Sequence, residues 1–254
     1  MLVLFTDFGF QGPYVGQMKA VLHAGAPGVP VIDLMHDAPP FDPRSSAYLL
    51  AALAGELAPG AVVLGIVDPG VGTDRRALAV EVDGRWFIGP DNGLFALTVR
   101  RAAVARAWEI TWRPDRLSAS FHGRDLFAPV AAAIAAGGTF VGTFPGREIA
   151  VQEVDRNDWP DELERIVYID GFGNAISGMR AENLSPNHRI LVHNVEIKGE
   201  KTFASVPPDS LFWYANSSGL VEIACNRGRA DRRLGLSVGT GVRVVGNQSV
   251  TVVT

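Results

Sequence analysis

The sequence predicts a two-domain protein with an N-terminal, mostly parallel α/β domain and a smaller C-terminal all-β domain. Strand-like and helix-like patterns alternate over about the first 150 residues, with the short loops typical of α/β domains. The pattern changes after Gly146, and short β-rich runs separated by turn residues follow it. A chain of 254 residues is long enough for one large domain or two smaller ones.

The elements of the first domain follow one another in βαβαβ order, which favours a mostly parallel sheet with helices on its faces. Asp42 and Pro43 mark a helix start, the carboxylate as N-cap and the proline at the first helical position. The predicted strands are 1–6, 29–35, 61–66, 77–82 and 86–88, and the predicted helices are 13–25, 43 to about 57, and two that start near Asn92 and Asp125.

The second domain is predicted from its turn-punctuated β runs. The polar stretch 147–163, with Asp158, Trp159 and Pro160, is typical of a linker. The runs after it have the spacing of a small barrel or sandwich: 165–170, 189–197, 219–225, 241–245 and 249–254. We therefore expect domains at 1–155 and 163–254.

Composition excludes several classes of protein. The formal net charge is −4 and no run of Lys or Arg is present, so we expect no nucleic-acid partner. The single cysteine, Cys225, excludes an internal disulfide and a multi-cysteine metal site, and we expect it in a strand core. The longest apolar stretch, 128–138, is too short to span a bilayer, and no signal peptide is evident, so we expect a soluble, cytoplasmic protein.

Four polar clusters fall at predicted strand ends or helix starts in the first domain, where ligands bind in doubly wound sheets. They are Thr6–Gly9, Val67–Arg76, Gly89–Gly93 and Phe121–Pro129. The second of these, VDPGVGTDRR, places a carboxylate, two glycines and two arginines after a buried strand. That composition suits a polar site better than packing, although a solvent-exposed turn capped by Asp68 and Pro69 is the simpler alternative.

Among the five histidines only His122, just before a predicted helix, has a setting that suits chemistry. We interpret His23, His36, His188 and His193 as structural or surface residues. No His or Cys pair has metal-ligand spacing, and neither a Walker loop nor a nucleophile elbow is present. In the second domain, Asp170–Gly178 and Asn216–Gly228 carry Asn and Ser side chains at strand ends, which either bind a polar ligand or cap turns.

Together these motifs resemble one family, the S-adenosyl-L-methionine hydroxide adenosyltransferases, which are relatives of the 5′-fluorinase and 5′-chlorinase. The resemblance runs in order from near residue 5 to near residue 228. The matching segments are FTDFG, PYVGQMK, VDPGVGT with its Arg pair, GPDNG, FHGRDLFAPVAA, DGFGNAISG and NSSGLVEIACNRG. The resemblance implies an N-terminal α/β domain, a C-terminal β-barrel domain, and a homotrimer with active sites at subunit interfaces.

The resemblance also implies hydrolysis of S-adenosyl-L-methionine (SAM) at ribose C5′ to adenosine and L-methionine, with SAM as substrate and no further cofactor or metal. The matching catalytic positions are Asp68, Arg75 and His122. The matching substrate positions are Asp7 (ribose diol), Phe41 (near the ribose), Phe172 and Asn174 (adenosine), Ser217 (methionine end), and Asn226 and Arg227 (adenine edge, through backbone groups). Gly12 and Ile176 depart from the pattern, since many relatives carry an acidic residue at the first position and the halogenases a tryptophan at the second.

The chemistry explains why these residue types are needed. Neutral water attacks sp³ carbon poorly, so it must be oriented and deprotonated as the bond forms. His122 has a reference pKa suited to accepting a proton, Asp68 either orients the imidazole or accepts the proton itself, and Arg75 keeps Asp68 ionised. A halide needs no deprotonation, so the three residues together favour hydrolysis over a 5′-halogenase. A non-catalytic adenosine- or SAM-binding protein stays open as an alternative, because binding and catalytic residues share the same crevice.

Overall fold

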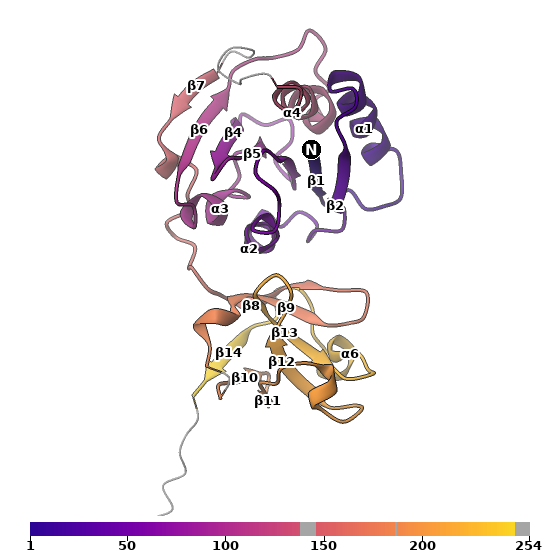
Figure 1. Cartoon of the computed structure of the whole chain (residues 1–254), viewed down its shortest axis with the longest axis vertical. Coiled ribbons are helices and arrows are strands. Elements are labelled where there is room, and N and C mark those ends of the chain that lie inside the picture. The colour runs from indigo at the N-terminus through magenta and orange to yellow at the C-terminus, as the bar shows by residue number, and fades with distance from the viewer. Residues whose placement is uncertain (138–145, 186, 247–254) are drawn as a thin grey trace, which may run out of the picture. The chain divides into compact units, whose positions relative to one another are not determined.

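The computed structural model describes residues 1–137, 146–185 and 187–246, and it divides into two units, Met1–Asp158 and Trp159–Thr254 (Figure 1). The division falls inside the segment predicted to be a linker. No helix in the described ranges has the length and apolar character needed to cross a membrane.

The first unit is built on a seven-stranded sheet in the order β2-β1-β3-β5-β4-β6-β7. Its strands are β1 (Leu2–Thr6), β2 (Val31–Met35), β3 (Val62–Ile66), β4 (Ala77–Val82), β5 (Arg85–Pro90), β6 (Ala105–Ile110) and β7 (Gly146–Ile149). Strands β1, β2, β3 and β5 are mutually parallel, whereas β4 is antiparallel to both β5 and β6. Because β6 therefore runs in the direction of β5, the predicted mostly parallel sheet is confirmed, with antiparallel pairing confined to its β4-β6-β7 side.

Two helix pairs cover the sheet: α1 (Tyr14–Gly25) packs with α4 (Ala128–Ala135), and α2 (Pro43–Ala54) packs with α3 (Ala96–Arg100) (Figure 1). Met18 and Leu22 of α1 are fully buried against Leu2, Leu4 and α4. The predicted cap of α2 is confirmed, since the Ser45 N–H donates to Asp42 Oδ1 at 3.0 Å. That helix ends at Ala54 rather than near Leu57.

Other predictions for the first unit were incomplete or inaccurate: β6 was not predicted, and the helix expected near Asn92 is α3, which begins at Ala96. The segment beginning at Arg147 is not a linker throughout, because β7 pairs with β6 and completes the sheet. The helix expected near Asp125 begins as a π-helical turn, η1 (Gly123–Phe127), that leads into α4. The His122 side chain is therefore placed at the start of a short wide turn that packs against α1.

The second unit contains two antiparallel sheets, β12-β13-β9-β8 and β11-β10-β14. Its elements are β8 (Leu163–Ile169), β9 (Ala175–Arg180), β10 (Arg189–Val192), β11 (Val195–Lys198), β12 (Leu211–Ala215), β13 (Leu220–Cys225), α6 (Ala230–Leu234) and β14 (Val242–Val245). Isolated bridges, Arg165 to Gly241 and Gly199 to Trp213, join the sheets on both sides. The strands thus close around one hydrophobic core, as in a small barrel.

The strand predictions for this unit were incomplete. The run 189–197 is a hairpin of two strands, turning at His193 with a φ of 50°. Strands β9 and β12 were not predicted. Cys225 lies buried in β13, as expected, and the predicted run 249–254 lies outside the described residues.

Candidate active site

A pocket of about 610 Å³ opens at the carboxyl ends of the parallel strands of the first unit. Asp7 directly follows β1, Asp68 follows β3, and His122 comes from the segment before η1. The lining residues are Asp7, Phe8, Tyr14, Gln17, Phe41, Ile66, Asp68, Val71, Ser118, Ser120, Phe121, His122, Gly123 and Arg124. Three of the four predicted clusters therefore converge, as the doubly wound topology requires.

Asp68, Arg75 and His122 form one contact set. Arg75 Nε donates to Asp68 Oδ1 at 2.8 Å, and Arg75 Nη2 donates to the other carboxylate oxygen. The same Nη2 lies 3.2 Å from His122 Nδ1. Since only 9% of the Arg75 side chain and 6% of the Asp68 side chain are exposed, this is a buried, bidentate ion pair.

Arg75 lies between Asp68 and His122 and does not itself line the pocket. No hydrogen bond joins Asp68 directly to the imidazole in the described residues, whereas Asp68 and His122 both line the pocket. Arg75 is thus placed to orient both of its partners.

The loop that carries Asp68 and Arg75 depends on its glycines. Gly72 has a φ of +82°, and a Cβ there would lie 2.6 Å from the carbonyl oxygen of Ala119. Any other residue would push the loop away from the segment that leads to His122. The Arg75 guanidinium also lies over the Phe127 ring, 5.3 Å from its centroid, which adds a cation–π contact from η1.

The environment of His122 keeps its imidazole neutral. Burial lowers the pKa of His122 first, and the positive charge of Arg75 lowers it further. Because a guanidinium only donates hydrogen bonds, Nδ1 facing Arg75 is the acceptor, and the hydrogen of the neutral ring lies on Nε2.

Asp7 lies on another wall of the same pocket. Burial raises the pKa of Asp7, and the nearby Asp68 carboxylate raises it further, against a hydrogen bond from the Phe41 N–H to Asp7 Oδ2 at 3.1 Å. Phe41 has a φ of +59° and leaves 77% of its surface exposed. Such a conformation is rare for an aromatic residue, and strain of this kind concentrates at functional sites.

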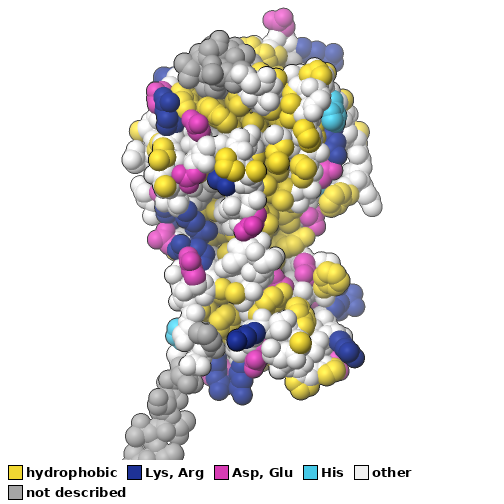
Figure 2. Space-filling model, in the orientation of Figure 1, with side chains coloured by type: hydrophobic (Ala, Val, Ile, Leu, Met, Phe, Trp, Pro, Cys, Tyr) yellow, Lys and Arg dark blue, Asp and Glu magenta, His cyan; other side chains and the backbone are white. Residues whose placement is uncertain are grey.

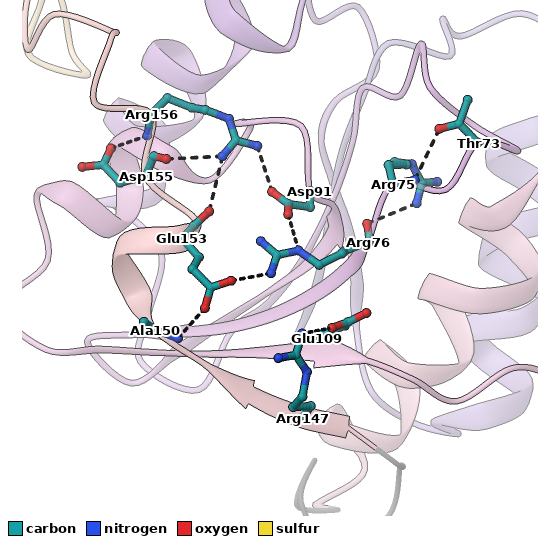
Figure 3. Close-up of polar contacts among 10 residues, drawn as sticks. All are labelled: Thr73, Arg75, Arg76, Asp91, Glu109, Arg147, Ala150, Glu153, Asp155 and Arg156. Carbon is teal, nitrogen blue, oxygen red and sulfur yellow. Dashed lines mark hydrogen bonds and ion pairs between the residues drawn. The ribbon is translucent and has the colours of Figure 1, made fainter.

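The fourth predicted cluster, Gly89–Gly93, does not line the pocket. Asp91 instead accepts from Arg76 Nε at 2.7 Å and from Arg156 Nη2 at 2.9 Å (Figure 3). Asp91 therefore lies beside the end of the loop that carries Asp68 and Arg75, outside the pocket.

A second pocket, of about 850 Å³, lies within the second unit. Phe172, Asn174, Ser217 and Arg227 line it, together with Ile176. Asn226 does not, because its Nδ2 donates to the Val206 carbonyl oxygen at 2.7 Å and so holds a turn. The side chain of Asn226 thus has a partner within the protein, and the expectation that its backbone groups contact the adenine edge stays a prediction.

Sequence reasoning missed polar residues in both pockets. In the second pocket Glu222 is buried and accepts from Tyr214 Oη at 2.6 Å and Asn216 Nδ2 at 3.0 Å. Burial raises the pKa of Glu222. A lone glutamate in the apolar run GLVEIAC was the available signal. In the first pocket Arg124 Nη1 donates to Gln17 Oε1 at 2.7 Å, a contact between distant segments that no local pattern predicts.

His36 has a structural setting. His36 is buried, with Nδ1 at 2.8 Å from Thr6 Oγ1 and Nε2 at 2.9 Å from Asp33 Oδ1, which agrees with its structural interpretation. Within the described part of the chain, no group of three or more His, Cys, Asp or Glu side chains is arranged to hold a metal ion.

Comparison with known proteins places this geometry in a family. The model of the SAM hydroxide adenosyltransferase N-terminal domain matches residues 2–143, and that of the C-terminal domain matches residues 164–243. An (R)-S-adenosyl-L-methionine hydrolase from Thermus thermophilus is 40% identical, with 94% of this chain and 97% of the relative covered. One of the same name from Salinispora arenicola is 36% identical, with 94% and 95% covered.

The fold comparison agrees. A crystal structure of an uncharacterized conserved protein from Thermotoga maritima superposes with a TM-score of 0.86 and 28% sequence identity, and covers 96% of this chain and all of that one. On these matches, which span both units, the chain belongs to the SAM hydroxide adenosyltransferase family.

Proposed function

We propose that this protein is an (R)-S-adenosyl-L-methionine hydrolase that cleaves SAM at ribose C5′ to adenosine and L-methionine. Membership of the family and relatives of that name, 36–40% identical over 94% of the chain, support the reaction. The observation that carries the assignment of residues is the contact set of Asp68, Arg75 and His122 on the wall of a pocket that also contains Asp7.

Water is the nucleophile, and Asp68 accepts its proton. As the carbon–oxygen bond forms, the attacking oxygen gains positive charge, and its proton becomes more acidic than a carboxylic acid. A carboxylate is therefore a sufficient base, provided that it is held in line. The leaving group is a neutral thioether expelled from a sulfonium, so it needs no general acid.

His122 and Arg75 orient this step. With Nδ1 accepting from Arg75, the imidazole presents Nε2–H to the pocket and positions the water by donating a hydrogen bond. Arg75 uses both oxygens of Asp68, which leaves the remaining carboxylate lone pairs for the water. This arrangement favours Asp68 over His122 as the proton acceptor.

Substrate contacts are divided between the two pockets. In the first unit Asp7 binds the ribose diol, because one carboxylate accepts from two vicinal hydroxyls, and Phe41 packs near the ribose. In the second unit Asn174 and Phe172 contact adenosine, and Ser217 contacts the methionine end. Backbone groups of Asn226 and Arg227 contact the adenine edge, and all of these residues except Asn226 line that pocket.

We also propose a homotrimer with active sites at subunit interfaces. Phe41 and Phe172, which line the first and second pocket, are 77% and 79% exposed, and apolar side chains are spread over the face of the first unit seen in Figure 2. Association covers such rings. Light scattering tests the proposal: a mass of three 27.2 kDa chains is expected, and a monomer that turns over SAM contradicts it.

The reaction is tested by incubating the pure protein with SAM in ¹⁸O-labelled water, with and without chloride or fluoride. Adenosine with one label at the 5′ oxygen, and methionine in equal amount, are expected in every arm. A 5′-haloadenosine indicates a halogenase. Methylthioadenosine contradicts the assignment, and SAM binding without product indicates a non-catalytic binding protein.

A matched pair of variants assigns the base. Asp68→Asn removes the carboxylate from the contact set, and we expect a loss of about 10²–10⁴-fold in kcat. Asp74→Asn makes the same chemical change on an exposed side chain of the same loop and should leave kcat unchanged.

A further inference from the structure

The dipeptide Asp91–Asn92 contacts both ends of the loop that carries Asp68 and Arg75, although it lies outside the pocket. Asn92 Nδ2 donates to the carbonyl oxygen of Val67 at 2.7 Å. The Asp91 N–H donates to the carbonyl oxygen of Arg76 at 3.0 Å. Val67 directly precedes Asp68 and Arg76 directly follows Arg75, so each anchor lies one residue from a member of the contact set.

Ion pairs reinforce the Arg76 end. Asp91 is directly opposite Arg76 at the open end of the β4–β5 pair, where the register pairs Ala77 with Pro90. Its side chain, only 10% exposed, accepts from Arg76 Nε at 2.7 Å and from Arg156 Nη2 at 2.9 Å. Arg76 Nη1 also donates to Glu153 Oε2 at 2.7 Å (Figure 3). Two carboxylates from separate segments thus fix one guanidinium.

At the Val67 end of the loop the contact comes from the side-chain amide of Asn92, whose orientation is fixed by a further hydrogen bond. Asn92 Oδ1 accepts from the Leu94 N–H at 3.2 Å, and the Asn92 N–H donates to the Pro90 carbonyl oxygen at 3.1 Å. The side chain therefore has a defined orientation, with its amide hydrogens directed at the last carbonyl before Asp68.

We propose that Asp91 and Asn92 are positioning residues for the hydrolytic reaction, which clamp the two ends of loop Val67–Arg76 and so keep Asp68 and Arg75 in register with His122. The inference rests on the proposed function. Within the loop Gly70 and Gly72 give the backbone little stiffness of its own. Two turns, from the Val71 N–H to the Asp68 carbonyl oxygen and from the Thr73 N–H to the Gly70 carbonyl oxygen, fix the middle of the loop. Its two ends need contacts from outside, as catalytic side chains in general need support from a surrounding shell.

Three variants separate positioning from folding. Asn92→Asp keeps the acceptor for the Leu94 N–H and loses the donor to Val67, and Asn92→Ala loses both without adding charge. Asp91→Asn keeps the backbone contact and removes the charge that pairs with Arg76 and Arg156. Glu109→Gln is the matched control, since it breaks the pair with Arg147, at 2.7 Å on the same sheet, without touching the loop.

We expect both Asn92 variants to lower kcat by about 10–100-fold with KM within about threefold, because displacements of about 1 Å at reacting groups cost rate rather than ground-state binding. Asp91→Asn lowers kcat by about tenfold, and Glu109→Gln leaves it unchanged. The acid limb of the kcat–pH profile moves to higher pH in the Asn92 variants, because Arg75 then lies farther from His122. The charged groups that act on the imidazole are Arg75, Asp68, Arg113 and Asp125.

Hydrogen exchange provides a readout that needs no turnover. Amides 70–76 should exchange faster in the Asn92 variants than in the wild type, while exchange in the β1 and β3 strands stays the same. Wild-type kcat and wild-type loop exchange in both Asn92 variants would overturn the clamp, as would a loss of activity in Asn92→Asp alone, which indicates a charge effect. A wild-type protein that does not cleave SAM refutes the proposed function instead, and the exchange data still decide the clamp.

Discussion

Replacing Arg75 by methionine tests whether the buried ion pair serves chemistry rather than stability. Methionine retains much of the apolar stem beside Phe127, so the main loss is the guanidinium with its contacts to Asp68, His122 and the Arg76 carbonyl oxygen. Asp68 is then left buried, with a side chain that is 6% exposed and without its cation.

The expected loss in the free energy of unfolding follows from the burial of Asp68. Removing one partner of a buried ion pair costs about 3–5 kcal/mol, because the other charge is left uncompensated. Replacing both partners by apolar groups of similar size is close to neutral or stabilising. We therefore expect Arg75→Met to lower the free energy of unfolding by about 3–5 kcal/mol, and the double variant Asp68→Leu with Arg75→Met to recover most of that loss.

Activity should not recover with stability. Urea unfolding at pH 7 measures the first quantity, and adenosine release, followed by chromatography at saturating SAM, measures the second. The double variant should be stable and without measurable turnover. The reasoning is wrong if Arg75→Met unfolds within about 1 kcal/mol of the wild type, or if the double variant is no more stable than the single one.

Three further outcomes are expected. Asp7→Asn should raise KM for SAM by about 10–100-fold, with a smaller change in kcat, because a charged hydrogen bond to the substrate is lost. In the wild type KM should rise as pH falls through the raised pKa of Asp7. A KM that does not change at acid pH argues against this role of Asp7. Phe41→Gly should raise the free energy of unfolding in urea by about 0.5–1 kcal/mol, because glycine relieves the positive φ at this position. The same variant should raise KM for SAM. A KM equal to that of the wild type would exclude Phe41 from the substrate site. The pKa of His122 is lowered in the folded state, so the unfolded chain binds the proton at higher pH than the folded chain does. The free energy of unfolding should therefore fall as pH drops below about 6.5. His122→Gln should flatten that dependence in unfolding curves measured over a pH series.

Local patterns predicted most elements of the first unit because several of them carry strong sequence signals. The Asp42 and Pro43 signal gave the start of α2, and buried apolar runs gave β1 and β3. In the second unit β9 escaped prediction because it includes Ser177, which is fully buried and pairs with the Val221 carbonyl oxygen. A polar residue satisfied by a neighbouring strand breaks the apolar pattern without breaking the strand.

The candidate site was likewise predicted only in part from the sequence. The convergence of Asp68 and His122 was predicted from the shared edge of the strand ends and from the family resemblance. The position of Arg75 between them was not predicted, because the path of a loop with two glycines cannot be read from sequence. The turn contact of the Asn226 side chain was not predictable either, because an asparagine that caps a turn and one that faces a ligand look alike in sequence.

The arginine at position 75 follows from the geometry it serves. One planar group must donate to two oxygens of Asp68 and to a ring nitrogen of His122, and an ammonium on a flexible stem does not match that fork. Gly72 is needed for the close approach to Ala119, and turns within the loop fix its middle. The two ends, next to Asp68 and Arg75, are contacted by Asn92 and Asp91, so a change in either contact acts directly on the residues of the contact set.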